Sequence, residues 1–240
     1  MEAHAFAVRT RKHTIAFMCG RFASTHSPNQ LQQWYDALVM PEFPVRYNVA
    51  PGAFIVAIRN APEGRVGSMM RWGFIPSWAK DPASMPMLNN ARGETVAEKP
   101  MFRQAFRRRR CLIPVSGFYE WKAVPGQRSK QPFYISFKDG SLMSLAGLWE
   151  TAKTADGDKV DTCTIITTDA NDALAPIHNR MPVIIGREDW ATWLSTDVVP
   201  DLALHALLRP FPHDVLQIWG VAHAVNKVSN DNASLLQPIA

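Results

Sequence analysis

The 240-residue chain is poor in cysteine, with only Cys19, Cys111 and Cys163. The three are an odd number, and none lies in a C-x-x-C pair or near clustered histidines. The pattern therefore argues against a disulfide framework and against a structural zinc site. Free thiols suit a reducing compartment, so we expect a cytoplasmic protein that needs no metal or other cofactor.

Long apolar runs are also absent. No stretch approaches the roughly 20 residues that cross a bilayer, so we expect no membrane partner. Residues 1–17 contain Arg9, Arg11 and Lys12, but no apolar core of about 7–15 residues follows them, which makes them a poor secretory signal. We expect residues 1–17 to be a non-native or cleaved extension ahead of one domain over residues 18–240.

Neither a Pro/Gly/Ser-rich linker nor an internal repeat divides the chain, so a single domain that acts as a monomer is expected. Short apolar segments bounded by Pro, Gly or Asp predict strands near residues 54–58, 68–72, 111–113, 118–122, 133–137, 141–149 and 163–168. The predicted class is α+β: one compact domain with a mostly antiparallel, β-barrel-like core and short peripheral helices.

Local signals predict three helices and one hairpin. The Ser27-Pro28-Asn29-Gln30 capping box opens a helix whose inward face is Leu31, Trp34, Tyr35 and Leu38. Residues 186–194 and 201–208 are typical of late helices. Asp139-Gly140 predicts a hairpin with a type I′ turn.

The charge is positive but uneven. The formal net charge is +5, and the run Arg107-Arg108-Arg109-Arg110 contributes four positive charges. This balance permits contact with phosphate backbones, although a basic run is more often only a solvated face.

Cys19 directly follows Met18. If Met18 is the initiator and is removed, or if the chain is cut before Cys19, one residue carries a free α-amine and a thiol. The amine condenses with an aldehyde to an imine, and the thiol then closes a five-membered thiazolidine. An internal cysteine lacks the amine, and the commonest role of a lone cysteine is a small buried hydrophobe.

Three further segments place polar residues where a core would favour apolar ones. Asn89, Asn90 and Arg92 lie in an apparent loop before a helix, where asparagines act as turn or cap residues or as ligands of a sugar hydroxyl. Glu120 lies in an alternating strand, either as a solvated carboxylate or as a buried proton donor with a raised pKa. His178 is a structural histidine or a proton-transfer group.

Six ordered segments together resemble the abasic-site-processing family, also called SOS-response-associated peptidases. They are Met18-Cys19-Gly20-Arg21-Phe22, residues 46–52, residues 72–78, Asn90-Ala91-Arg92, residues 117–121 and His178-Asn179-Arg180-Met181-Pro182. The resemblance implies an α+β domain with a basic channel for single-stranded DNA, in which a mature N-terminal cysteine crosslinks to the ring-opened aldehyde of an abasic site.

The resemblance also implies residue roles. Cys19 would be the nucleophile, Asn90 and His178 would position the open sugar, and Glu120 would move protons. Arg21, Arg92 and Arg180 would grip phosphates, while Pro51 and Trp78 would stack on or wedge between bases. Positive charge from Arg21 or a protonated His178 would assist the thiol.

Two departures qualify the resemblance. Residues 1–17 mask the amine of Cys19, which requires either initiation at Met18 or self-cleavage; a wrongly chosen start is the favoured explanation. Asn179 stands where the family often has Asp, which leaves the protonation of His178 open.

Abasic-site processing has two alternatives. One is a cysteine peptidase that uses Cys19, His178 and Glu120 or Asn90, mainly on its own prefix. The other is a non-catalytic basic DNA-binding module. The sequence names no replication partner.

Overall fold

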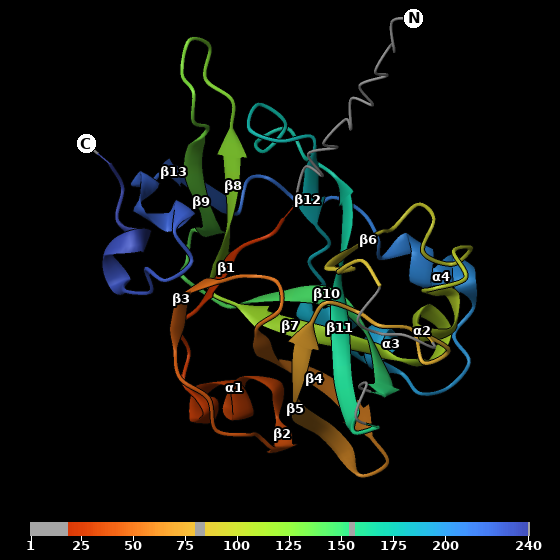
Figure 1. Ribbon diagram of the computed structural model, residues 1–240. Coiled ribbons are helices and arrows are strands. Elements are labelled where there is room, and N and C mark those ends of the chain that lie inside the picture. Colours follow the sequence, from red (N-terminus) through yellow and green to blue (C-terminus); the bar gives the residue numbers. More distant parts are fainter. Residues whose placement is uncertain (1–18, 80–84, 154–156, 240) are drawn as a thin grey trace, which may run out of the picture.

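The computed structural model describes residues 19–79, 85–153 and 157–239 (Figure 1). The expected extension at residues 1–17 lies outside these described residues. The predicted α+β class and barrel-like core are confirmed, because five strands close into a barrel that short helices surround.

The barrel consists of β4 (Phe54–Ala61), β5 (Gly64–Trp72), β7 (Arg110–Val115), β10 (Met143–Lys153) and β11 (Lys159–Asp169). Neighbouring strands pair antiparallel, except that β11 runs parallel to β5 where the ring closes. Three short strands extend this sheet: β6 (Asn90–Arg92) and β12 (Arg180–Pro182) lie along β11, and β2 (Ala37–Val39) lies along β5.

A second, antiparallel sheet packs against the barrel in the order β13 (Leu216–Gly220), β9 (Gln131–Phe137), β8 (Gly117–Lys122), β1 (Phe22–Ser24) and β3 (Arg46–Val49). In Figure 1, β8, β9 and β13 stand beside the chain's C-terminal segment, which carries the 3₁₀ turns η3 (His223–Asn226) and η4 (Ala233–Leu236).

The helices lie outside the barrel. They are α1 (Pro28–Tyr35), α2 (Arg103–Arg108), α3 (Trp190–Leu194) and α4 (Asp201–Ala206), with a 3₁₀ turn η2 (Arg187–Asp189) before α3. Figure 1 shows α2, α3 and α4 gathered on one side of the barrel and α1 on the other side, next to β2.

Strand alternation divides the core into two large clusters. Ile55, Trp72, Ile113 and Ile165 belong to a cluster shared with the second sheet, whereas alternate residues such as Ile58 pack with the helices. Gly147 on β10 makes room in the first cluster, because a Cβ there would approach the Cys111 sulfur to 2.8 Å.

The predicted capping box is present, since Ser27 and Gln30 exchange both hydrogen bonds at the start of α1. The predicted apolar face is wrong at one end. Asp36 adopts a left-handed φ of 50° and stops the helix after Tyr35, so Leu38 falls in β2 and is 59% exposed.

The predicted Asp139-Gly140 hairpin is also wrong. The flanking strands β9 and β10 belong to different sheets, so the turn links sheets instead of closing a hairpin. Gly140 has the positive φ, 71°, while the Asp139 carboxylate accepts a hydrogen bond from the Ser141 N–H. Asp139 is not among the described residues with positive φ, which excludes a type I′ turn.

Within the described ranges, no helix is long and apolar enough to cross a membrane.

Candidate active site

The pairing of β1 with β8 brings Cys19 to Glu120. Phe22 pairs with Phe118, Ala23 pairs with Gly117, and the Tyr119 N–H donates to the Arg21 carbonyl. If the same antiparallel register is continued towards the N-terminus, the residues just before β1 lie opposite Glu120. The backbone N–H of Cys19 donates to Oε1 of Glu120 at 2.7 Å.

Both partners of this hydrogen bond are buried, with 2% exposure each. Burial raises the pKa of Glu120 to about 8, although the N–H groups of Cys19 and Trp121 and the charge of Lys130 act in the opposite direction. Glu120 is therefore neutral and able to donate a proton at pH 7. This is the buried proton donor that the sequence left as one of two alternatives.

The Cys19 thiol packs in the apolar cluster that contains Phe22 and Trp72. Burial, and then the charge of Glu120, raise the pKa of this thiol well above its ordinary value. The expected assistance from positive charge does not outweigh burial in this chain, in which Cys19 is internal. The thiol is held protonated next to its own amide nitrogen.

Asn90 lies on the short strand β6, which the sequence had indicated as a loop before a helix. Its register partner is Ile165 on β11, and paired residues of a parallel ladder point to the same face. Ile165 belongs to the apolar cluster of Cys19, so Asn90 lies on the Cys19 side of the sheet. Asn90 is half-buried.

His178 precedes β12 and is also half-buried. Its Nδ1 lies 3.1 Å from the Arg180 nitrogen and 3.3 Å from the Arg180 carbonyl oxygen, so it accepts from the first or donates to the second according to its tautomer. Burial lowers the pKa of His178; the hydrogen bond with the Arg180 backbone acts in the opposite direction, and the charges of Lys130 and Arg180 lower the pKa further. The imidazole is therefore neutral at pH 7. This concerns the protonation of His178, which the replacement of Asp by Asn179 had left open.

Lys130 is a site residue that the sequence reasoning missed. It lies just before β9, whose Phe133 pairs with Glu120. Its charge lowers the pKa values of both Glu120 and His178, so the two titratable groups lie around one ammonium. Its position in an unremarkable loop gave no signal in the sequence.

The five residues expected to bind DNA differ in accessibility. Arg92 is exposed, and Trp78 is 59% exposed. Pro51 is half-buried and precedes Gly52, whose φ is 93°. These three are open to a ligand.

Arg21 and Arg180 are bound internally instead. Arg21 is partly buried and donates through Nη1 to the Asn48 side chain and to the Val225 carbonyl. Arg180 is 7% exposed, and ion pairs with Glu94 and Asp169 hold its guanidinium. A phosphate-gripping role does not fit Arg180, because both of its terminal nitrogens are bound within the protein and its Nε is buried.

The arginine run is not one basic face either. Arg107 pairs with Asp201, and Arg109 pairs with Glu150 at 2.6 Å. Arg110 is buried and donates to the carbonyls of Phe106, Trp193 and Ser195. Three of the four charges thus stabilise contacts within the protein. Among the described residues, no cluster of three or more His, Cys, Asp or Glu side chains could hold a metal ion.

Comparisons with known proteins agree on a family. The sequence profile described as SOS response associated peptidase (SRAP) matches residues 18–228. Abasic site processing protein YoaM of Bacillus subtilis is 38% identical over 222 residues, which cover 91% of this chain and 97% of YoaM. Abasic site processing protein YedK of Escherichia coli is 31% identical over 233 residues, or 92% of this chain and 100% of YedK.

Solved structures share the fold. An X-ray structure of a protein from Bacteroides thetaiotaomicron matches with a TM-score of 0.84 at 24% identity, covering 92% of this chain and 100% of that one. A protein from Bordetella bronchiseptica matches with a TM-score of 0.74 at 26% identity, covering 85% and 100%.

Proposed function

Because this chain belongs to the SOS response associated peptidase (SRAP) family, we propose that it processes abasic sites in single-stranded DNA by covalent capture through an N-terminal Cys19. The relatives are named for abasic site processing. The observation that carries the proposed chemistry is the 2.7 Å contact between the Cys19 nitrogen and Glu120. When Cys19 is the first residue, that nitrogen is an α-amine beside a buried carboxyl.

The capture proceeds in two bond-forming steps. The neutral amine adds to the aldehyde carbon of the ring-opened sugar, and loss of water from the carbinolamine leaves an imine. The sulfur then adds to the imine carbon while the thiol proton passes to nitrogen, which gives a thiazolidine. The net reaction joins aldehyde and aminothiol with release of one water.

Glu120 suits the proton transfers in these steps. An unperturbed α-amine has a pKa of about 7.7–8.0. Glu120 has a pKa of about 8 while Cys19 is internal, and a free α-ammonium beside it would favour the carboxylate. The amine and the carboxyl would then lie close enough to exchange a proton directly. In its ionised form, Glu120 accepts a proton from the attacking amine and returns it to the departing hydroxyl, which leaves as water.

The remaining residues handle the sugar and the strand. The neutral imidazole of His178 and the amide of Asn90 hydrogen-bond to the sugar oxygens as the ring opens. Arg92 contacts phosphate, and Trp78 and Pro51 contact the flanking bases. β-Elimination of the strand from the imine intermediate is a further outcome of the same chemistry.

Self-cleavage is a second candidate activity, favoured by the same contact. The Cys19 nitrogen is the leaving atom when the Met18–Cys19 bond breaks, and a protonated Glu120 lies 2.7 Å from it. In such a cleavage the Cys19 sulfur would add to the Met18 carbonyl carbon, Glu120 would protonate the leaving nitrogen, and water would hydrolyse the resulting thioester. Such cleavage would produce the terminus that crosslinking requires.

The test uses chain that begins at Cys19, incubated with an abasic single-stranded oligonucleotide. A heat-stable adduct is expected, and Cys19→Ala should abolish it. Cys19→Ser keeps the amine without the thiol, so it should give an adduct only after reduction with borohydride. A heat-stable adduct of equal yield with Cys19→Ala would refute the proposed capture.

Self-cleavage is tested separately by intact mass measurement of the 240-residue chain and its Glu120→Gln variant. Loss of the prefix from the first but not from the second supports self-cleavage. Equal retention of the prefix in both excludes it.

A further inference from the structure

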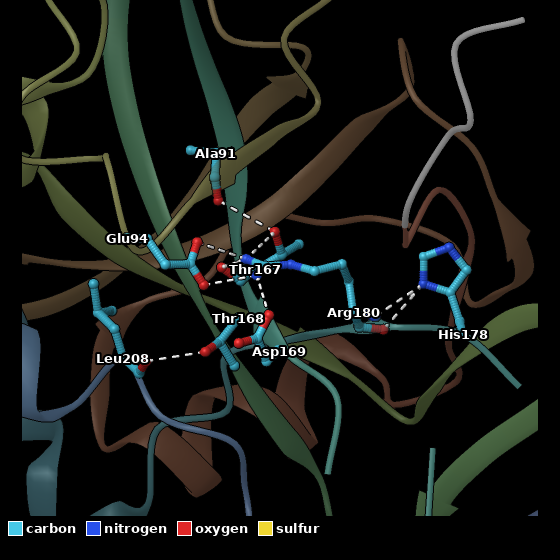
Figure 2. Close-up of polar contacts among 8 residues, drawn as sticks. All are labelled: Ala91, Glu94, Thr167, Thr168, Asp169, His178, Arg180 and Leu208. Carbon is cyan, nitrogen blue, oxygen red and sulfur yellow. Dashed lines mark hydrogen bonds and ion pairs between the residues drawn. The ribbon is translucent and has the colours of Figure 1, made fainter. Parts of the chain in front are cut away.

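Buried Arg180 forms the centre of an ion cluster at the edge of the site (Figure 2). Its two terminal nitrogens bind both oxygens of the Glu94 carboxylate, at 2.7 and 2.9 Å. Nη1 also donates to Asp169 and Nη2 to the Thr167 carbonyl, each at 2.7 Å. The paired contact with Glu94 fixes the plane of the guanidinium as well as its position.

This cluster spans β11. Thr167 of β11 pairs with Arg92 of β6 on one edge and with Pro182 of β12 on the other. Glu94 follows the end of β6, and Arg180 begins β12. The Glu94–Arg180 pair thus joins two short strands that do not pair with each other.

A residue of the proposed sugar site lies in β6, and another lies just before β12. Asn90 begins β6, and His178 lies two residues before Arg180. The backbone of Arg180 also holds the imidazole, because its N–H donates to Nδ1 of His178 or its carbonyl accepts from Nδ1, according to the tautomer. Figure 2 shows the imidazole beside the Arg180 backbone and the Glu94 carboxylate at the far end of the same side chain.

We propose that Glu94 is a positioning residue that, through its paired contact with Arg180, holds Asn90 and His178 in the geometry that opens the sugar ring. This proposal rests on the proposed function and adds a residue to its site. Three-residue strands have few ladder bonds of their own, so a link across β11 decides their relative placement. Glu94 itself touches neither the Cys19 nitrogen nor Glu120.

The charges in the cluster support a firm link. Burial alone would raise the pKa of Glu94, but the hydrogen bonds and charge of Arg180 outweigh it, and the pKa is lowered. Glu94 therefore stays ionised at neutral pH. The ion pair between Glu94 and Arg180 is therefore intact at neutral pH.

The chain offers a matched control. Asp169 also contacts Arg180, but it lies on β11 itself, and its side chain is 80% exposed compared with 46% for Glu94. Asp169→Asn removes one carboxylate from Arg180 and leaves the link between β6 and β12 intact. Glu94→Gln removes the same charge and weakens that link.

The experiment uses chain that begins at Cys19 and two aldehydes. The abasic oligonucleotide, at saturating concentration, requires ring opening before capture. Formaldehyde needs none and reports only on the Cys19 aminothiol and Glu120. Crosslinking is followed in a single turnover by gel, and thiazolidine formation with formaldehyde is followed by intact mass.

Glu94→Gln should slow capture of the abasic site by about 10- to 100-fold, the loss expected when a reacting group is misplaced by about an ångström. It should leave the formaldehyde rate and the DNA affinity close to the parent values. Asp169→Asn should be close to the parent chain in all three. The ¹⁵N shifts of His178 should change in Glu94→Gln alone.

Two results would overturn the proposal. Equal abasic-site rates for Glu94→Gln and the parent chain would show that the link positions nothing. An equal fall with both aldehydes would show a general loss of the site or the fold. If the parent chain captured formaldehyde but not the abasic site, the proposed function itself would fail, and the role of Glu94 with it.

Discussion

Replacing Glu120 with Gln should remove a large pH dependence from the stability of the protein. Moving the pKa of this carboxyl from 4.5 to about 8 penalises its ionised form by about 5 kcal/mol, at 1.36 kcal/mol for each pH unit. The glutamine side chain has nearly the same shape as the protonated glutamate, and its carbonyl can still accept from the Cys19 N–H. It does not titrate.

The sign follows from the raised pKa. Between pH 4.5 and about 8 the folded chain keeps a proton on Glu120 that the unfolded chain has lost. The stability of the parent chain therefore falls as the pH rises through this window, by up to about 5 kcal/mol, and the contribution is constant above it. The variant lacks this loss.

The assay is differential scanning calorimetry of the 240-residue chain and Glu120→Gln from pH 5 to pH 9. Taking the difference between the two chains cancels the other titrating groups. The variant should gain relative to the parent by about 10 °C or more in Tm between these limits, since 1 kcal/mol corresponds to about 2–4 °C for a chain of this size. A Tm difference that is the same at pH 5 and pH 9 would refute the buried, neutral Glu120.

The same comparison, made on chain that begins at Cys19, tests whether the free α-amine faces Glu120. A free α-ammonium opposite Glu120 stabilises the carboxylate, so the pH window should move down and narrow. An unchanged window would mean that the new terminus does not face Glu120.

Three further predictions concern the edges of the site. Lys130→Gln should raise the pKa values of Glu120 and His178, because the Lys130 charge lowers both, and should move the pH profile of crosslinking upward; an unmoved profile would contradict this. Arg92→Gln should weaken the binding of single-stranded DNA equally across sequences and reduce the salt slope by about 0.7, which corresponds to one phosphate contact, whereas an unchanged slope would exclude that contact. Trp78→Ala should cost about 1–3 kcal/mol of DNA binding through lost stacking and leave Tm unchanged, because Trp78 is 59% exposed; Leu202→Ala, at an even more exposed apolar position on α4, should bind like the parent, and an equal loss in both would deny a stacking role for Trp78.

The longer strands were predictable because most are apolar runs, buried along much of their length and bounded by Pro, Gly or Asp. The seven predicted strands correspond to β4, β5, β7, β8, β9, β10 and β11, most of them extended at one or both ends. Strands of three residues, such as β6 and β12, are too short to show a recognisable pattern of apolar residues. They exist because β11 offers free edges to pair with, which is tertiary information.

The failures have the same origin. The spacing of Leu38 fits a helix, yet a left-handed Asp36 ends α1 first. Asp139-Gly140 is a valid local turn, but the partners of β9 and β10 lie in other sheets. The local sequence determines the geometry of the turn, whereas the pairing of strands into sheets determines which elements the turn connects.

The site was partly predictable. The family-like segments of the sequence indicated Cys19, Asn90, Glu120 and His178 as candidate site residues. The structure places Cys19 and Glu120 in direct contact. Charge composition could not separate exposed Arg92 from buried Arg180, because both follow a similar local pattern. Only burial and ion partners distinguish a phosphate ligand from a structural cation.

The central claim is that the nitrogen facing Glu120 becomes the reacting amine. It is tested most directly by determining the first residue of the protein recovered in an adduct with an abasic oligonucleotide. The account predicts Cys19 at that terminus, with sulfur and nitrogen both bonded to the sugar carbon in the digested peptide. An adduct whose protein still begins before Cys19, formed at the full rate, would contradict it.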